Sequence, residues 1–69
     1  MTTSTATRVG ANVKAELARR GITQAQLAEQ LGISNPSMTG RLQGKIPLDV
    51  NELEQIASYL DTTTATLLV

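Results

Sequence analysis

The sequence predicts an all-α fold of five short helices in one small domain. Apolar residues recur at helical spacing in successive segments, and capping residues, glycines and prolines separate these segments. Tyr59 is the single aromatic residue, so the core must consist of aliphatic side chains, Met and Ala, which suit packed helices better than strands. A chain of 69 residues buries about 60% of the surface that its unfolded form exposes. Its core must therefore consist of few side chains in a regular pattern.

The first helix is predicted over residues 8–20, after a disordered polar arm at residues 1–7. Its apolar face consists of residues four apart: Val9, Val13 and Leu17. Thr7 is placed to cap the start. Arg19 and Arg20 fall in the last turn, where we expect them to act as solvated charges that complement the helix dipole.

The second helix is predicted to begin after Thr23. Thr23 and Gln26 have the spacing of a capping box, in which each side chain bonds a backbone N–H of the other residue. Gly32 ends this helix after about two turns because glycine readily adopts the left-handed conformation. Its predicted buried face consists of Leu27, Ala28 and Leu31.

A third helix is predicted to follow at once, with Ser34 or Asn35 as its cap. Proline is tolerated in the first turn of a helix, so Pro36 marks a beginning. The inward residues are four apart: Met38 and Leu42. Gly44 is expected to end this helix.

Two more helices complete the predicted fold after a connector at residues 45–48. Asp49 and Glu52 form a second capping-box pair, and Thr63 caps the last helix. The fourth helix is predicted to bury Leu53, Ile56, Ala57 and Leu60. The apolar residues of the last helix are Ala65, Leu67 and Leu68.

The second and third predicted helices together have the pattern of a helix-turn-helix. Ala28 permits the two helices to cross closely, and Gly32 supplies the turn. The outward residues of the third helix are small, and most are polar: Asn35, Ser37, Thr39 and Gly40. A helix with such a surface can lie deep in the major groove of DNA, where hydrogen bonds to base edges carry sequence information.

The chain also resembles a known family at these positions. It contains Thr-Gln-x-x-Leu-Ala-x-x-Leu-Gly-Ile-Ser from Thr23, a Gly-Lys pair at Gly44 and Glu-Leu-x-x-Ile-Ala from Glu52. This pattern resembles the helix-turn-helix of phage Cro and repressor proteins and their bacterial relatives, over nearly the whole chain. The resemblance implies a lambda-repressor-like DNA-binding domain at residues 8–69.

The resemblance also implies roles for individual residues. Gln24 would bond a phosphate, and Gln43 and Lys45 would hold the DNA backbone. The residues expected near bases or neighbouring phosphates are Ser34, Asn35, Ser37 and Thr39. For Asn35 a capping role and adenine reading remain open alternatives.

Two positions of the third helix depart from the family pattern. The family usually has an apolar residue where this chain has Arg41, so we infer that Leu42 takes the inward position and frees Arg41 for a phosphate or a guanine edge. Gly40 replaces a long polar side chain that often reads bases. The absence of this side chain either removes the contact with the base or lets the backbone of the helix approach DNA closely.

Charge is divided along the chain although the formal net charge is zero. Before Ile46 there are six cations and two anions, a net charge of +4, and the rest of the chain carries −4. Phosphate contacts require local cations, so neutrality allows DNA binding but predicts weak non-specific affinity. We expect the acidic residues to face away from DNA.

Composition excludes several other functions. The chain has no Cys and no His, which excludes disulfides, the usual zinc sites and His-based acid–base catalysis. We therefore expect no enzyme activity, cofactor or metal. No apolar run approaches the ~20 residues that span a bilayer, and a soluble protein of the bacterial cytoplasm or nucleoid is expected.

The sequence thus predicts sequence-specific binding of double-stranded DNA for transcriptional regulation, most simply as a phage-type repressor or Cro-like regulator. Tight binding would require a homodimer on two half-sites, formed on DNA or through a region outside the chain. The alternative is a protein-interaction module of antitoxin or antirepressor type, with a partner on the acidic fourth helix. Whether the chain is complete or an N-terminal fragment remains open.

Overall fold

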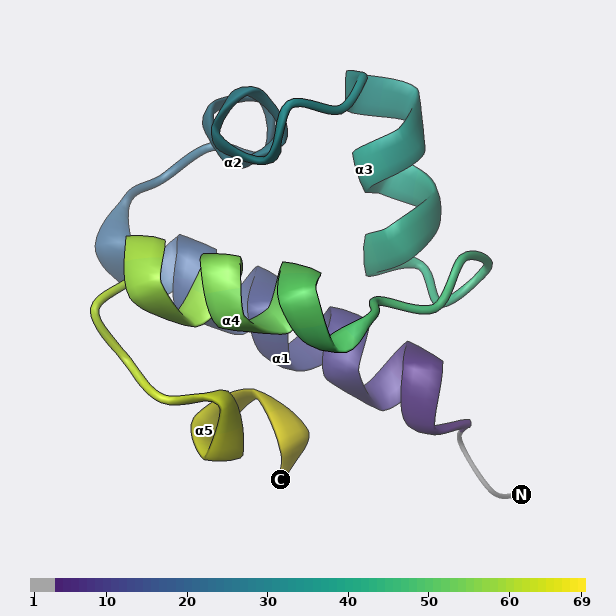
Figure 1. Ribbon diagram of the computed structural model, residues 1–69, viewed down its shortest axis with the longest axis vertical. Coiled ribbons are helices and arrows are strands. Elements are labelled where there is room, and N and C mark those ends of the chain that lie inside the picture. The colour runs from purple at the N-terminus through teal and green to yellow at the C-terminus, as the bar shows by residue number, and fades with distance from the viewer. Residues whose placement is uncertain (1–3) are drawn as a thin grey trace.

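The computed structural model describes residues 4–69, which form five helices and no strands (Figure 1). The helices are α1 (Thr5–Arg20), α2 (Gln24–Leu31), α3 (Asn35–Leu42), α4 (Val50–Tyr59) and α5 (Thr64–Leu68). The predicted all-α fold is confirmed. Helix α3 packs on α1 and α2, and α4 packs on α2 and α5.

One core joins all five helices, because each contributes one fully buried side chain. These residues are Val13, Leu27, Met38, Ile56 and Leu67, in the order of the helices. The predicted inward residues of α2, α3 and α4 are buried or pack against this core. In α5 Leu67 is buried, whereas Ala65 and Leu68 are exposed.

Helix α1 begins earlier than predicted. Ser4 caps it by accepting a hydrogen bond at Oγ from the Thr7 backbone N–H (3.1 Å), so Thr7 lies inside the helix. The predicted start at Arg8 was wrong because Ser4 is an equally good capping residue one turn earlier. The predicted disordered arm is therefore helical from Thr5 onward, and its residues 1–3 lie outside the described residues.

The caps of the next helices follow the predictions. Thr23 accepts from the Gln26 backbone (3.1 Å), and the Gln26 side chain accepts from the Thr23 backbone (2.8 Å). Asp49 and Glu52 make the same reciprocal pair at 2.7 and 3.0 Å. Ser34 caps α3, accepting from the backbone of Ser37 at 3.2 Å.

Helix α3 lies close against the N-terminal half of α1. A Cβ atom placed on Gly10 would lie 2.4 Å from the carbonyl oxygen of Leu42, so no larger residue fits without separating the two helices. Gly44 adopts a positive φ of 81°, and a Cβ there would lie within 2.8 Å of the Thr7 backbone. The end of α3 is thereby fixed on α1.

Polar contacts tie the opposite end of α1 to the rest of the domain. Glu16 is buried and pairs with Arg19 and with Arg20, whose Nη1 is 2.6 Å from the carboxylate. Arg20 also donates from Nε to the carbonyl oxygen of Leu60 at the end of α4 (2.8 Å). Both arginines lie in the last turn of α1 as expected, and the Arg19 side chain is 65% exposed. They also have a role that was not predicted, because a buried carboxylate requires charged partners.

Candidate nucleic-acid interface

The connection between α2 and α3 confirms the predicted helix-turn-helix. Gly32 has a φ of 71°, and its N–H donates to the carbonyl of Glu29 (3.1 Å). The next N–H, of Ile33, donates back to Ala28 (3.0 Å), and Ser34 immediately caps α3. Ala28 is buried, as expected for a residue at a close helix contact. Figure 1 shows α2 nearly end-on, with α3 beside it and running down the picture.

Gln24, the first residue of α2, braces the first turn of α3. Its amide Nε2 lies 2.9 Å from Oδ1 of Asn35, 3.3 Å from the Asn35 carbonyl and 2.5 Å from Oγ1 of Thr39. Since Ser34 is the cap, the alternative that Asn35 serves only as a cap is excluded. Asn35 is exposed while Gln24 holds its oxygen, so its side chain is pre-ordered at the surface.

Arg41 is engaged within the protein. Its Nε donates to Oε2 of Glu52 (2.9 Å), and its Nη1 donates to Oγ (2.6 Å) and the carbonyl (3.3 Å) of Ser37. Only 16% of the Arg41 side chain is exposed. Leu42 takes the inward position as inferred, but the accompanying inference that Arg41 is free was wrong.

Glu52 differs from the simple cap and solvated charge that its sequence position suggests. It contacts α3 through Arg41, with only 15% of its side chain exposed. Its second oxygen completes the capping box with Asp49. No sequence signal indicated this pair, because its members lie in different helices, 11 residues apart.

The remaining predicted site residues lie on or near α3. Ser34 is exposed and uses its hydroxyl as the cap, while Ser37 and Thr39 are half-buried. Gln43 and Lys45 are exposed after the last turn of α3. The structure thus brings all eight predicted residues to one helix-turn-helix and the loop that follows it, with Arg41 bonded to Glu52 of α4.

Ile46 was not predicted as a site residue. It lies in the connector between α3 and α4, beside Gly40, and is 39% exposed. The sequence signal that could have indicated Ile46 is an apolar residue directly after Lys45 in a connector.

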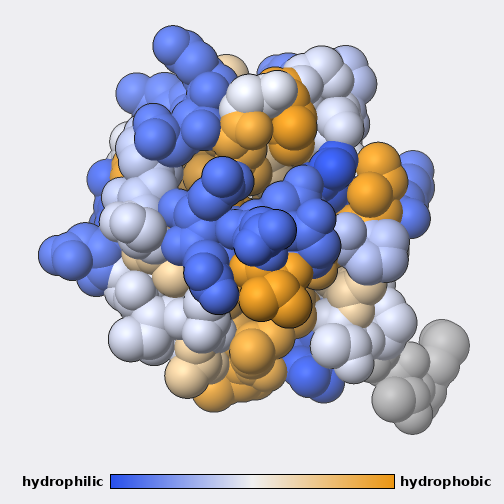
Figure 2. Space-filling view, viewed as in Figure 1, coloured by the Kyte–Doolittle hydropathy of each residue, from blue (hydrophilic) through white to orange (hydrophobic). Residues whose placement is uncertain are grey.

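The six cations do not form one continuous face around α3. Two of them pair with Glu16 at the far end of α1, and a third pairs with Glu52. Figure 2 shows hydrophilic side chains spread over the visible face with apolar patches between them. The divided charge of the sequence is therefore partly neutralised by local pairs.

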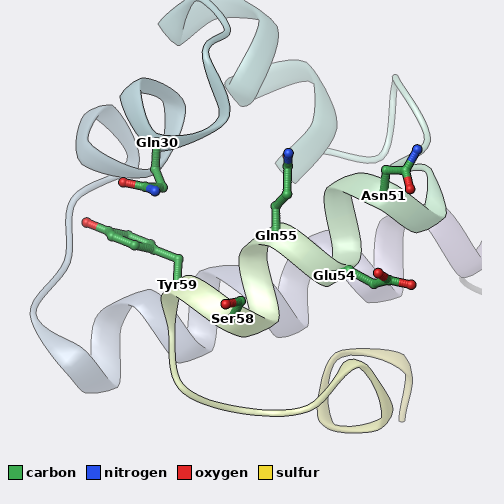
Figure 3. Close-up of a pocket in the computed structure, with 6 residues that line it drawn as sticks. All are labelled: Gln30, Asn51, Glu54, Gln55, Ser58 and Tyr59. Atoms are coloured by element: carbon green, nitrogen blue, oxygen red, sulfur yellow. The ribbon is translucent and has the colours of Figure 1, made fainter.

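A groove of about 520 Å³ lies between α2 and α4, outside the helix-turn-helix turn (Figure 3). Gln30 of α2 faces Tyr59 across it, and Gln55 projects from α4 into the space. The other lining residues are Asn51, Glu54 and Ser58. The lining is polar and carries one acidic side chain.

Within residues 4–69 no cluster of three side chains suited to bind a metal ion is present. None of the helices in this range combines the length and hydropathy that a bilayer crossing requires.

The fold and the geometry of α2 and α3 define a helix-turn-helix protein of the DNA-binding class. The sequence matches the Cro/C1-type HTH DNA-binding domain family over residues 12–69, and the chain belongs to this family. No curated protein sequence matches the chain.

Two solved structures share the fold. The first is the clp gene regulator ClgR from C. glutamicum, with a TM-score of 0.90, 21% identity, and coverage of 97% of this chain and 87% of that chain. The second is the DNA-binding domain of BldD, with a TM-score of 0.81, 18% identity and full coverage of both chains.

Proposed function

We propose that this domain binds operator DNA in a sequence-specific manner and regulates transcription, most simply as a phage-type repressor or Cro-like regulator. Helix α3 enters the major groove, and base edges are read from its polar first turn. The single observation that carries this proposal is the brace from Gln24 to Asn35 and Thr39. It orders an exposed polar helix start before any ligand arrives, which lowers the entropic cost of binding.

The backbone contacts of the proposal come from both ends of the motif. Gln24 lies at the N-terminus of α2, where backbone N–H groups and the helix dipole favour a phosphate. Gln43 and Lys45 lie beyond the other end of α3. The proposed interface comprises Gln24, Ser34, Asn35, Ser37, Thr39, Gln43 and Lys45. Arg41 would join these residues only when its bond to Glu52 opens.

A single recognition helix reads few base pairs, so the proposal includes a homodimer on two half-sites about one helical turn apart. Such a regulator would act in the cytoplasm of a bacterial host, on the nucleoid. Leu68 and Val69 are 44% and 80% exposed at the end of α5 and offer apolar surface for pairing.

Selection of binding sites from random double-stranded oligonucleotides tests the proposal. The purified chain should enrich one palindromic motif, and titration of that motif at two salt concentrations should show affinity that falls with salt. The spacing of the half-sites would report the dimer geometry. A chain that folds but enriches no motif would contradict the proposal.

A second candidate function is binding of a partner protein on α4, as in an antitoxin or antirepressor. The observation that favours it is the polar groove beside Glu54 and Gln55. A selection without any enriched motif would favour this function over operator binding.

A further inference from the structure

The outward surface of α3 lacks a side chain at its centre. Met38 and Leu42 are buried, and each residue of an α-helix advances by about 100° around the axis. Gly40 lies two residues from each of them, so it points away from the core. The position from which a helix in the major groove would reach deepest therefore has no side chain of its own.

Ile46 fills the space beside Gly40. A Cβ atom placed on Gly40 would lie 2.9 Å from Cδ1 and 3.3 Å from Cγ1 of Ile46. The backbone N–H groups of Lys45 and Ile46 both donate to the carbonyl oxygen of Gly40, at 2.9 and 3.2 Å. The connector is thus bonded back onto α3, and Figure 1 shows it looping outward beside the C-terminal end of that helix.

This arrangement leaves an aliphatic side chain partly exposed at the proposed interface. Ile46 is 39% exposed, and its immediate neighbours along the chain include the exposed cation Lys45. Apolar surface that contacts water in the free protein becomes favourable when a ligand covers it. A ligand at this position should therefore present an apolar group.

We propose that Ile46 determines sequence specificity by contacting the 5-methyl group of a thymine in the major groove. The thymine methyl is the apolar group that base edges display there, since the other distinguishing groups are hydrogen-bond donors and acceptors. Gly40 permits the contact because any larger residue would displace Ile46. This inference rests on the proposed function and adds an apolar reader to its polar interface.

The first test compares binding-site selections by the unaltered chain, Ile46→Ala and the control Val50→Ala. Val50 is also apolar and 70% exposed, but it lies in α4, outside the proposed interface. The unaltered chain should prefer thymine at one position of each half-site. Ile46→Ala should lose that preference and retain the others, whereas Val50→Ala should retain all of them.

The second test removes the methyl group from the DNA. Replacing the preferred thymine by deoxyuridine should weaken binding of the unaltered chain about fourfold, which corresponds to one buried methyl group. Ile46→Ala should bind both duplexes equally. Far-UV circular dichroism of each variant establishes that it is folded.

The outcomes separate this inference from the function on which it rests. If the unaltered chain enriches no motif, operator binding and the role of Ile46 are both wrong. If it enriches a motif but binds thymine and deoxyuridine duplexes equally, the role of Ile46 alone is wrong. Discrimination that persists in Ile46→Ala would assign the methyl contact to another residue.

Discussion

At the scale of single residues, the guanidinium of Arg41 is less available to an external ligand because Glu52 lies beside it. Its guanidinium is bonded to Glu52 of α4 and to Ser37, one turn earlier in its own helix. These contacts use the Nε–H and Nη1–H groups, which arginine can also use to bind phosphate and guanine. Under the proposed function, Glu52 would therefore compete with DNA for Arg41.

We expect Glu52→Gln to strengthen binding of non-specific duplex DNA. The amide oxygen can still accept from the Asp49 backbone in the capping box, but the charge that holds Arg41 is lost. One additional phosphate contact should steepen the plot of log affinity against log salt by about 0.9. Fluorescence anisotropy at several salt concentrations measures both quantities.

Glu54→Gln is the matched control, because it removes the same charge from an exposed position of the same helix. An equal gain in both variants would indicate general repulsion of DNA and would contradict the competition. The competition would also be contradicted if Glu52→Gln still strengthened DNA binding in a chain that carries Arg41→Met.

At the scale of helices, the orientation of α3 depends on how closely α1 and α3 approach. Gly10 is buried where α1 meets the carbonyl groups of Arg41 and Leu42. Helix propensity alone disfavours glycine in the interior of α1 by about 1 kcal/mol relative to alanine. The close contact between α1 and α3 nonetheless requires glycine at this position.

Gly10→Ala should therefore destabilise the domain, against its helix propensity. The added methyl group would lie 2.4 Å from a backbone oxygen, and relieving such overpacking typically costs about 1–3 kcal/mol. Urea unfolding followed by circular dichroism measures the change in the free energy of unfolding. Ala11→Gly, at the exposed neighbouring position, measures the propensity contribution separately. A larger free energy of unfolding for Gly10→Ala would contradict this prediction, because it would mean that α1 and α3 can separate without loss of stability.

At the scale of the whole molecule, ion pairs reduce the charge that is available to DNA. Arg19 and Arg20 pair with Glu16, and Arg41 pairs with Glu52. These pairs engage half of the six Lys and Arg side chains. The others are Arg8, Lys14 and Lys45.

Non-specific binding should consequently depend only modestly on salt. Three phosphate contacts per domain correspond to a slope of about −3 in log affinity against log salt, from about 0.9 per contact. Titration of a random duplex between 50 and 200 mM salt, chosen on the order of cellular ionic strength, measures this slope. A slope near −5 per domain would mean that the paired arginines open and also bind phosphate.

Local sequence determined most of the helices of this protein. The caps at Thr23, Asp49 and Thr63 were predictable because a capping side chain bonds an N–H only three residues away. The helix-turn-helix was predictable for the same reason, since its turn depends on Gly32 and its immediate neighbours. The family match confirmed the class of protein that these motifs indicated. The start of α1 was misjudged because two capping residues compete over one turn.

Only the tertiary structure decided which side chains of the predicted interface are engaged. Glu52 lies 11 residues from Arg41, Asn35 lies 11 residues from Gln24, and Asn12 donates to the Leu67 carbonyl across 55 residues. Such pairs form only after the core has set the distances between helices, so no local pattern encodes them. The position of Ile46 beside Gly40 belongs to the same group. The DNA contacts of the eight candidate site residues stay predictions, while their arrangement follows from the packing of α3 on α1 and α2.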